Sequence, residues 1–192
     1  YGELYTIYDN VIKETVSFIS TTIARQSFKL NYGDLLFAGS GETKEEIGKS
    51  AVILRDDTYA GGDIIVFRYK NIDPIFLGYL SNSNTVIKQK TLNGQGDAVV
   101  HIYSSGISKI KIPLPPLAEQ KAIAEVLSDT DNLIQGISQK LAKKRAIKQG
   151  AMQRLLKPKE DWEMKKLRDV GEVKMCRRIF NHETNIKGDI PF

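Results

Sequence analysis

Several short stretches of this chain carry side chains that can form hydrogen bonds with the edges of DNA bases. Arginine, lysine, asparagine and glutamine match the donors and acceptors that base pairs present in the major groove. The candidates lie in three stretches: Arg25 and Gln26; Lys88, Gln89, Lys90, Asn93 and Gln95; and Arg177 and Arg178. Each set also suits an ordinary solvated surface, so the residues alone leave both interpretations open.

The glycine-rich segment "AGSGETKEEIG" (residues 38–48) raises the question of phosphate binding. It lacks the Gly-Lys-Ser/Thr ending of a P-loop, so a loop that glycines hold beside a strand is the simpler interpretation. Lys44, together with Ser40 and Thr43, still has the chemistry to contact a DNA phosphate. Lys44 therefore joins the candidate DNA-binding residues.

No stretch has the pattern of a catalytic site. The sequence contains no Asn/Asp-Pro-Pro-aromatic motif for adenine methylation, no glycine-rich turn suited to S-adenosylmethionine, and no carboxylate cluster typical of a nuclease. We find no Ser-His-Asp set, and we interpret His101 and His182 as surface or satisfied residues. The lone Cys176 excludes an internal disulfide and fits a reducing cytoplasm. The sequence thus predicts a non-enzymatic chain without cofactor or metal.

The net charge of +5 is distributed unevenly along the chain. Residues 1–116 hold 12 basic and 12 acidic side chains, and residues 117–136 hold one base and four acids. Residues 137–157 hold seven bases and no acid, and residues 158–192 hold eight bases and seven acids. The excess charge therefore belongs to residues 137–157, and it does not by itself place DNA on the first 116 residues.

The elements that position these candidates follow from the apolar pattern. Residues 1–111 favour β-structure, because short β-branched or aromatic runs alternate with Gly, Asn and Asp. The expected strand segments are residues 15–20, 34–40, 50–54, 63–69 and 109–112. Residues 76–91 favour a short helix and residues 92–100 a glycine-rich turn. Residues 162–180 return to a β-like pattern that charges interrupt.

Three prolines, Pro113, Pro115 and Pro116, end the β pattern and precede a long helix over residues 117–157. Its apolar seam recurs at alternating spacings of four and three, through Ile123, Leu127, Thr130, Ile134, Ile137 and Leu141. About forty residues give a rod of ~60 Å, longer than the roughly 40 Å diameter of a compact 150-residue domain. We therefore expect this helix to pair with another helix, although packing against its own domain is the ordinary alternative.

The first half of this helix is acidic and its second half is basic. Two copies packed antiparallel would place each acidic half beside a basic half, whereas parallel copies would bring like charges together. The same distribution also complements the helix dipole, so both effects remain open.

The stretches "LPPLAEQ" and "KKRAIKQGAMQRLL" resemble the central conserved region of specificity (S) subunits of type I restriction-modification systems. "GDLLFAGSGETKEEIGKSAV" is similar to the body of a target recognition domain in that family, and "WEMKKLRDVGEV" to the opening of the next one. The resemblance implies a non-catalytic subunit that binds double-stranded DNA. In such complexes modification (M) subunits methylate adenine and restriction (R) subunits cleave.

From this resemblance we expect an α/β (α+β) recognition-domain body over residues 1–116, a spacer helix over 117–157, and the start of another recognition domain over 158–192. The chain would then be half an S subunit or a fragment, and its two-repeat relatives suggest an antiparallel homodimer. Each tail would complete the partner's domain, with Trp162 on the partner's body and Phe192 near its Tyr1. The alternative is a coiled-coil interaction adaptor without DNA binding.

Overall fold

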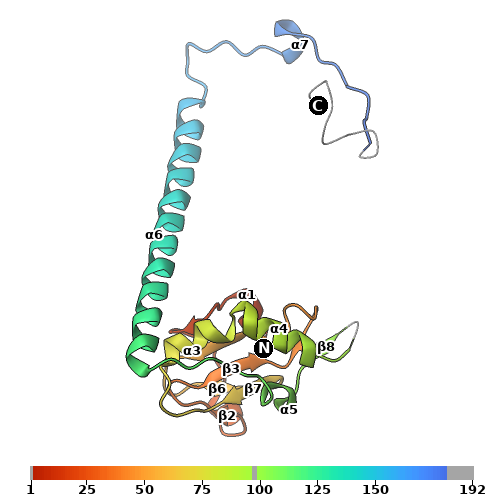
Figure 1. Cartoon of the computed structure of the whole chain (residues 1–192). Coiled ribbons are helices and arrows are strands. Elements are labelled where there is room, and N and C mark those ends of the chain that lie inside the picture. Colours follow the sequence, from red (N-terminus) through yellow and green to blue (C-terminus); the bar gives the residue numbers. More distant parts are fainter. Residues whose placement is uncertain (1, 97–98, 181–192) are drawn as a thin grey trace. The chain divides into compact units, whose positions relative to one another are not determined.

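The computed structural model describes residues 2–96 and 99–180 and has a mixed α/β architecture (Figure 1). This confirms the expected fold class of a sheet-containing domain with one long helix. Two compact units follow one another along the sequence, Tyr1–Gln139 and Lys140–Phe192. The described elements are α1 (Gly2–Thr6), β1 (Val11–Ile12), α2 (Thr21–Ala24), β2 (Phe28–Lys29), β3 (Leu35–Ala38), β4 (Ser40–Gly41), β5 (Ser50–Ile53), β6 (Tyr59–Ala60), β7 (Ile64–Phe67), α3 (Pro74–Ser81), α4 (Asn84–Asn93), β8 (Val100–His101), α5 (Ser104–Ile107), α6 (Leu117–Leu155) and α7 (Leu167–Val170).

The first unit is built on a four-stranded sheet in the order β1-β5-β3-β7. β1 runs parallel to β5, while β3 pairs antiparallel with β5 and β7, so that Leu36 lies opposite both Ala51 and Val66. The sequences LLFA and SAVI explain the central place of β3 and β5, because every residue of both strands is buried. The short ribbons β2–β6 and β4–β8 are antiparallel as well.

Helix α3 packs against strand β5 and buries Phe76 and Leu77. Asp73 caps its first turn by accepting a hydrogen bond from the Phe76 backbone N–H, and Pro74 occupies the first helical position. A Cβ atom at Gly78 would lie 2.4 Å from the Asn10 carbonyl oxygen, so this close approach requires glycine. α3 and α4 together replace the single helix expected over residues 76–91.

Three segments that the sequence predicts as β-structure form no strand in the described part of the chain. Residues 15–20 lead as irregular chain into α2, residues 109–112 form an extended connector, and residues 162–180 contain α7 but no strand. A β-branched run becomes a strand only where another backbone can pair with it. At Lys111 that place is taken by the side chain of Gln89, which binds both backbone groups of the residue.

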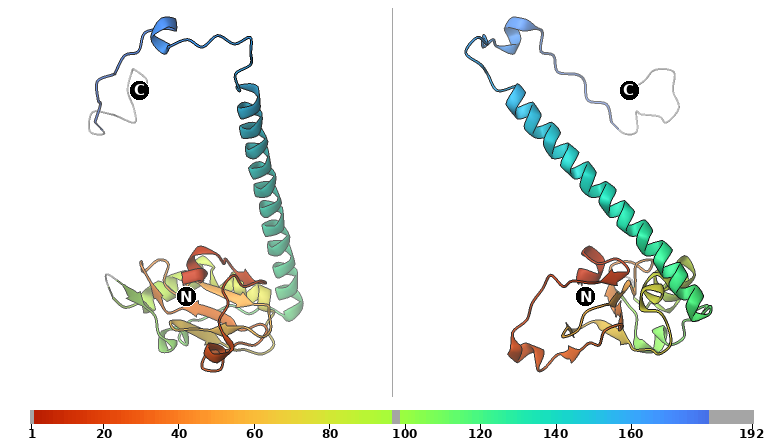
Figure 2. Two further views of the ribbon diagram at one scale, coloured as in Figure 1. Left: turned by 180° about the vertical axis from the view of Figure 1, so that it is seen from behind. Right: turned by 90° about the vertical axis from the view of Figure 1, so that its left-hand side faces the viewer.

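The arm (residues 13–27), which joins β1 to β2 and carries α2, stands away from the sheet (Figure 2). Ser20 caps α2 through its hydroxyl, which accepts a hydrogen bond from the Ile23 backbone N–H. Phe18 is 84% exposed. The arm therefore contributes little to the core and presents its residues to the surroundings.

Helix α6 spans 39 residues and ends within two residues of the predicted position. The carbonyl of Pro116 accepts hydrogen bonds from the backbone N–H groups of Glu119 and Gln120, which makes Pro116 the start of the helix. At ~1.5 Å per residue the helix is ~58 Å long. Within the part of the chain that the structure describes, no helix combines the length and apolar character needed to cross a membrane.

Candidate nucleic-acid interface

The densest predicted set of DNA contacts, residues 88–95, lies on the last turns of α4 and just beyond them. Only Lys88 and Gln95 of this set are exposed. The remaining three side chains are committed to contacts within the fold. Burial argues against the predicted DNA contact for Lys90 alone, and the contacts of the other four residues stay a prediction.

Lys90 corrects the prediction most clearly, because it is 1% exposed and cannot reach DNA in this fold. Its ammonium group donates a 2.7 Å hydrogen bond to the Gly48 carbonyl and lies 5.9 Å from the centre of the Phe37 ring. Burial lowers the pKa of Lys90 from 10.5 to about 8. This lysine ties α4 to the loop before β5 and belongs to the core.

Gln89 and Asn93 are also structural side chains. The Gln89 amide donates to the Lys111 carbonyl and accepts from the Lys111 N–H, both at 2.8 Å. Asn93 donates a 2.8 Å bond to the Gln89 carbonyl. With its amide nitrogen and its amide oxygen both bonded to Lys111, Gln89 holds the connector that leads to α6.

The other predicted contacts are exposed but come from separate elements. Arg25 and Gln26 follow α2 in the arm, and Lys44 lies in the loop between β4 and β5. Arg177 and Arg178 belong to the second unit, where the Arg178 guanidinium lies 5.0 Å from the centre of the Phe180 ring. All five side chains are exposed, as a DNA contact requires. Their role as DNA contacts stays a prediction.

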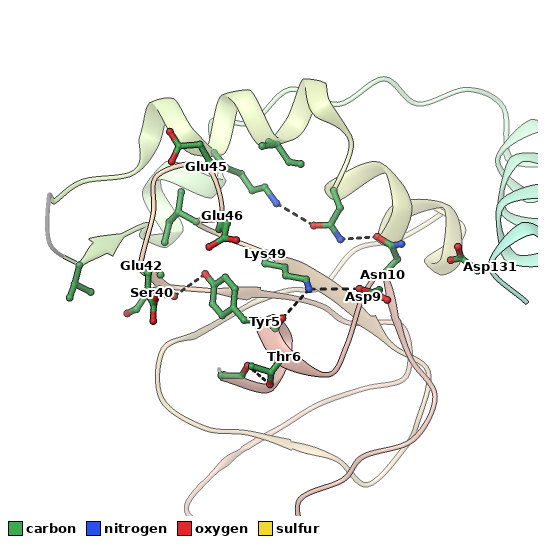
Figure 3. A pocket seen from close by; sticks show the side chains of 17 residues that line it. Tyr5, Thr6, Asp9, Asn10, Ser40, Glu42, Glu45, Glu46, Lys49 and Asp131 are labelled. Atoms are coloured by element: carbon green, nitrogen blue, oxygen red, sulfur yellow. Dashed lines mark hydrogen bonds and ion pairs between the residues drawn. The ribbon is translucent and has the colours of Figure 1, made fainter. Parts of the chain in front are cut away.

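A groove of about 930 Å³ in the first unit is unsuited to a DNA backbone (Figure 3). Its carboxylates are Asp9, Glu42, Glu45, Glu46 and Asp131, whereas its two lysines are Lys49 and the buried Lys90. Lys49 lies between the Tyr5 carbonyl, at 3.4 Å, and the Asp9 carboxylate, at 3.8 Å. The groove is therefore acidic, and its charge repels phosphates.

A polar cluster that the sequence did not reveal joins Ser40, Asp63 and His101. The Ser40 hydroxyl donates to the Asp63 carboxylate at 3.0 Å and lies 3.1 Å from Nδ1 of His101. A serine nucleophile needs the histidine between serine and carboxylate, with the hydroxyl open to substrate. Here the serine occupies the middle position and is 4% exposed, so the order does not suit acyl transfer.

Several hydrogen bonds anchor the first part of α6 within the first unit. Gln120, which is 3% exposed, accepts a 2.9 Å bond from the Asp73 N–H and donates a 2.8 Å bond to the Pro115 carbonyl. One turn later, Ala124 is buried as well. Three turns beyond Gln120, Asp131 accepts a 2.8 Å bond from the Tyr79 hydroxyl. The beginning of the rod is thus anchored at several points along α3 and the connector.

The predicted pairing seam runs along α6 beside these anchors, because Leu127 lies three residues after Ala124 and four before Asp131, and most of the seam is exposed. Ile134 is 56% exposed, Ile137 58% and Leu141 49%, while Ile123 is half-buried. Val126 and Leu133 are more than 60% exposed and broaden the apolar stripe. An apolar stripe of this length is unusual on an isolated helix and marks a surface for association. Its occupant stays a prediction.

Among residues 2–96 and 99–180, no group of three or more His, Cys, Asp or Glu side chains could hold a metal ion. The predicted contact between Phe192 and the partner's Tyr1, and the predicted role of His182, lie outside the described residues. Trp162, which the sequence predicts to lie on the partner's body, is within the described residues and is 43% exposed. Its contact with a partner stays a prediction.

Comparison with known proteins gives the candidate interface a context. A family model described as the type I restriction modification DNA specificity domain matches residues 6–143. The type I restriction enzyme MjaVIII specificity subunit of Methanocaldococcus jannaschii is 30% identical over 172 residues, which cover 79% of this chain and 38% of that protein. The type I restriction enzyme EcoKI specificity subunit of Escherichia coli K12 is 31% identical over 114 residues, covering 57% of this chain and 24% of that protein. The chain thus spans less than two fifths of the length of either relative.

Proposed function

Because the chain belongs to the type I restriction-modification DNA specificity domain family, we propose that it recognises a specific DNA sequence on behalf of partner methyltransferase and restriction subunits. The family match over residues 6–143 is the observation that carries this proposal. It covers the sheet domain and the first part of α6. In this proposal the chain does no chemistry itself, and base modification and cleavage belong to the partners.

The recognition surface excludes the acidic groove and the buried Lys90, and it includes the exposed cations of the first unit. Arg25 with Gln26 in the arm, Lys44 and Lys88 supply phosphate and base contacts, since phosphate contacts position a domain and base contacts specify the site. A salt titration of binding to a random duplex tests the phosphate part. The affinity of a DNA-binding chain falls steeply with salt, whereas an adaptor without DNA binding shows no salt-dependent complex.

The long helix pairs with α6 of a second copy in antiparallel orientation. Gly136 is the central residue of α6, and a Cβ at this position would meet nothing within 4 Å. The helix is acidic before this residue and basic after it, so antiparallel pairing places opposite charges together along both halves. The exposed stripe through Ile134 and Ile137 lies at the middle of this pairing. Sedimentation of the purified chain tests it, because a monomer at micromolar concentration would exclude the pairing.

In a two-fold dimer the second unit of each chain can pack against the partner chain. Its apolar side chains Met164, Leu167, Val173 and Met175 are each at least 75% exposed. We assign these residues to the body of the partner chain, where Trp162 packs as well, so that each tail completes the other chain's recognition domain. Fluorescence of Trp162, the single tryptophan, reports on this contact. Its emission should shift to the red upon dissociation, and an unchanged spectrum would argue against the exchange.

The alternative function, an interaction adaptor without DNA binding, has one specific observation in its favour. The first 116 residues are electrically balanced, and the groove in Figure 3 is acidic. A basic protein segment would suit such a surface better than DNA would. The salt titration separates the two functions, since the adaptor requires that no duplex binds at physiological salt.

A further inference from the structure

A hollow of about 530 Å³ lies between the turn before β7 and the end of β8 and shares no lining residue with the acidic groove. The residues that line it include the ring-bearing Phe28, His101 and Tyr103, together with the polar Asp63 and Ser104. None of the residues that the sequence predicts as DNA contacts lines this hollow. Its combination of flat rings with hydrogen-bonding groups is typical of sites that receive planar, polar molecules.

The backbone holds the polar side of this hollow rigidly. Ser40 of β4 and His101 of β8 are paired in register, and the Ile102 N–H donates to the Gly39 carbonyl at 2.9 Å. The Gly39 N–H in turn donates to the Asp63 carbonyl at 2.7 Å. A Cβ at Gly39 would lie 3.1 Å from that carbonyl oxygen, so glycine permits the approach. These bonds place Asp63 and His101 at a fixed distance from each other.

The hydrogen-bonding roles within the cluster follow from the single proton of the Ser40 hydroxyl. That proton goes to Asp63, so Nδ1 of His101 must donate to the Ser40 oxygen. A neutral His101 therefore keeps Nε2 as an acceptor, and within the described parts of the chain no hydrogen bond to Nε2 is found. Asp63 uses one carboxylate oxygen for Ser40, which leaves the second oxygen as a further acceptor.

The aromatic side of the hollow is open to a ligand. The rings of His101 and Tyr103 are nearly parallel, with centroids 6.4 Å apart and an interplanar angle of 18°. Tyr103 is 56% exposed and Phe28 is 55% exposed. The Arg68 guanidinium lies 5.8 Å from the centre of the Phe28 ring, and its ion pair with the buried Asp34 holds it there. Flat apolar surfaces thus lie beside the two acceptors.

We propose that this hollow is the base-reading pocket of the recognition domain and receives the edge of a base that carries an exocyclic amino group, a cytosine or an adenine. Asp63 accepts the amino hydrogen, and the rings of Tyr103 and Phe28 contact the neighbouring base pair. The negative charge of Asp63 disfavours a phosphate in the same place, so the contact is to a base. This inference rests on the proposed DNA recognition and assigns it to residues that the sequence pattern missed.

Asp63→Asn is the sharpest test. Asp63 has a positive φ of 59°, a conformation that asparagine tolerates well, so the fold should persist. The matched control is Asp57→Asn, because Asp57 has a φ of 51° and lies outside the hollow. A second variant, Tyr103→Leu, removes the ring, and its control is Tyr32→Leu at a tyrosine that is 57% exposed.

The experiment selects bound sequences from a randomised duplex library with the purified chain and each variant. We expect Asp63→Asn to change the base preference at one position of the half-site and to lower affinity for the wild-type sequence at least about fivefold. Tyr103→Leu should weaken the preference at the same position or the adjacent one, and neither control should do so. Identical selected sequences and affinities for wild type and both hollow variants would overturn the inference while leaving DNA recognition intact. A uniform loss of affinity with an unchanged sequence would overturn it too. A wild-type chain that selects no sequence would instead refute the proposed function on which the inference rests.

Discussion

The hydroxyl of Tyr79 in α3 donates a 2.8 Å hydrogen bond to the carboxylate of Asp131, 52 residues later in α6. Asp131 lies three turns along α6 from Gln120, the buried residue that fixes the beginning of this helix. The first part of the helix is therefore held against the sheet domain by at least two contacts.

Tyr79→Phe should lower the free energy of unfolding by about 0.5 kcal/mol, since the bond is solvent-exposed and its loss leaves few buried groups unpaired. Chemical denaturation measures the change. Tyr32→Phe is the matched control, because Tyr32 is exposed and lies in the turn before β3. Equal stability of the two variants would show that the Tyr79–Asp131 contact does not hold the helix.

Gln120→Leu should destabilise more strongly, by about 2–3 kcal/mol, because it leaves the Asp73 N–H and the Pro115 carbonyl without their partner. Gln139→Leu makes the same chemical change at an exposed position of α6 and should leave stability nearly unchanged. A loss of similar size in both variants would point to helix propensity or solubility as the cause.

The lowered pKa of the buried Lys90 should make the stability of the fold depend on pH. Its folded pKa of about 8 lies below the ordinary value of 10.5, so the unfolded chain binds more protons between these values. Stability should therefore rise from pH 8 to pH 10.5, and a difference of about 2.5 pKa units corresponds to about 3 kcal/mol. Lys90→Met should remove this rise. Unfolding curves across this pH range would contradict the assignment if the wild type and the variant had the same slope.

Charges in the α6 stripe should disrupt pairing without unfolding the sheet domain. Ile134→Asp with Ile137→Asp places two carboxylates where apolar side chains meet in the proposed dimer, and an unpaired buried charge is costly. Asn132→Asp with Gln139→Asp adds the same two charges on the opposite face of the helix. Sedimentation should show monomers for the first double variant and dimers for the second. Dimers in both cases would place the interface elsewhere.

Substitutions of exposed and of buried basic residues should differ in their effect on DNA binding. Arg25→Ala and Lys88→Ala should weaken binding similarly for all sequences and reduce the slope of log affinity against log salt by about one each. Lys90→Met, at a buried position, should leave the slope unchanged. A normal slope in the two exposed variants would remove the arm and α4 from the interface.

The sequence predicts some of this fold because its signals are local. The prolines at 113, 115 and 116 and the apolar repeat indicate α6 to within two residues, and the apolar runs of β3, β5 and β7 indicate the sheet. Burial of Lys90 is not a local property, because it depends on Gly48 and Phe37, which lie far away in sequence. The same reason explains the missed hollow, since Ser40 is separated by 23 residues from Asp63 and by 61 from His101.

The most direct test of the central claim is the arrangement of the sequence that the purified chain selects from a random duplex library. A two-fold dimer with identical recognition domains at the ends of an antiparallel rod binds two copies of one half-site as an inverted repeat with a fixed spacer. We predict such a repeat, with the spacing lost in the variant that carries aspartate at positions 134 and 137. A single half-site, a direct repeat, or no enriched sequence from the wild-type chain would contradict this account.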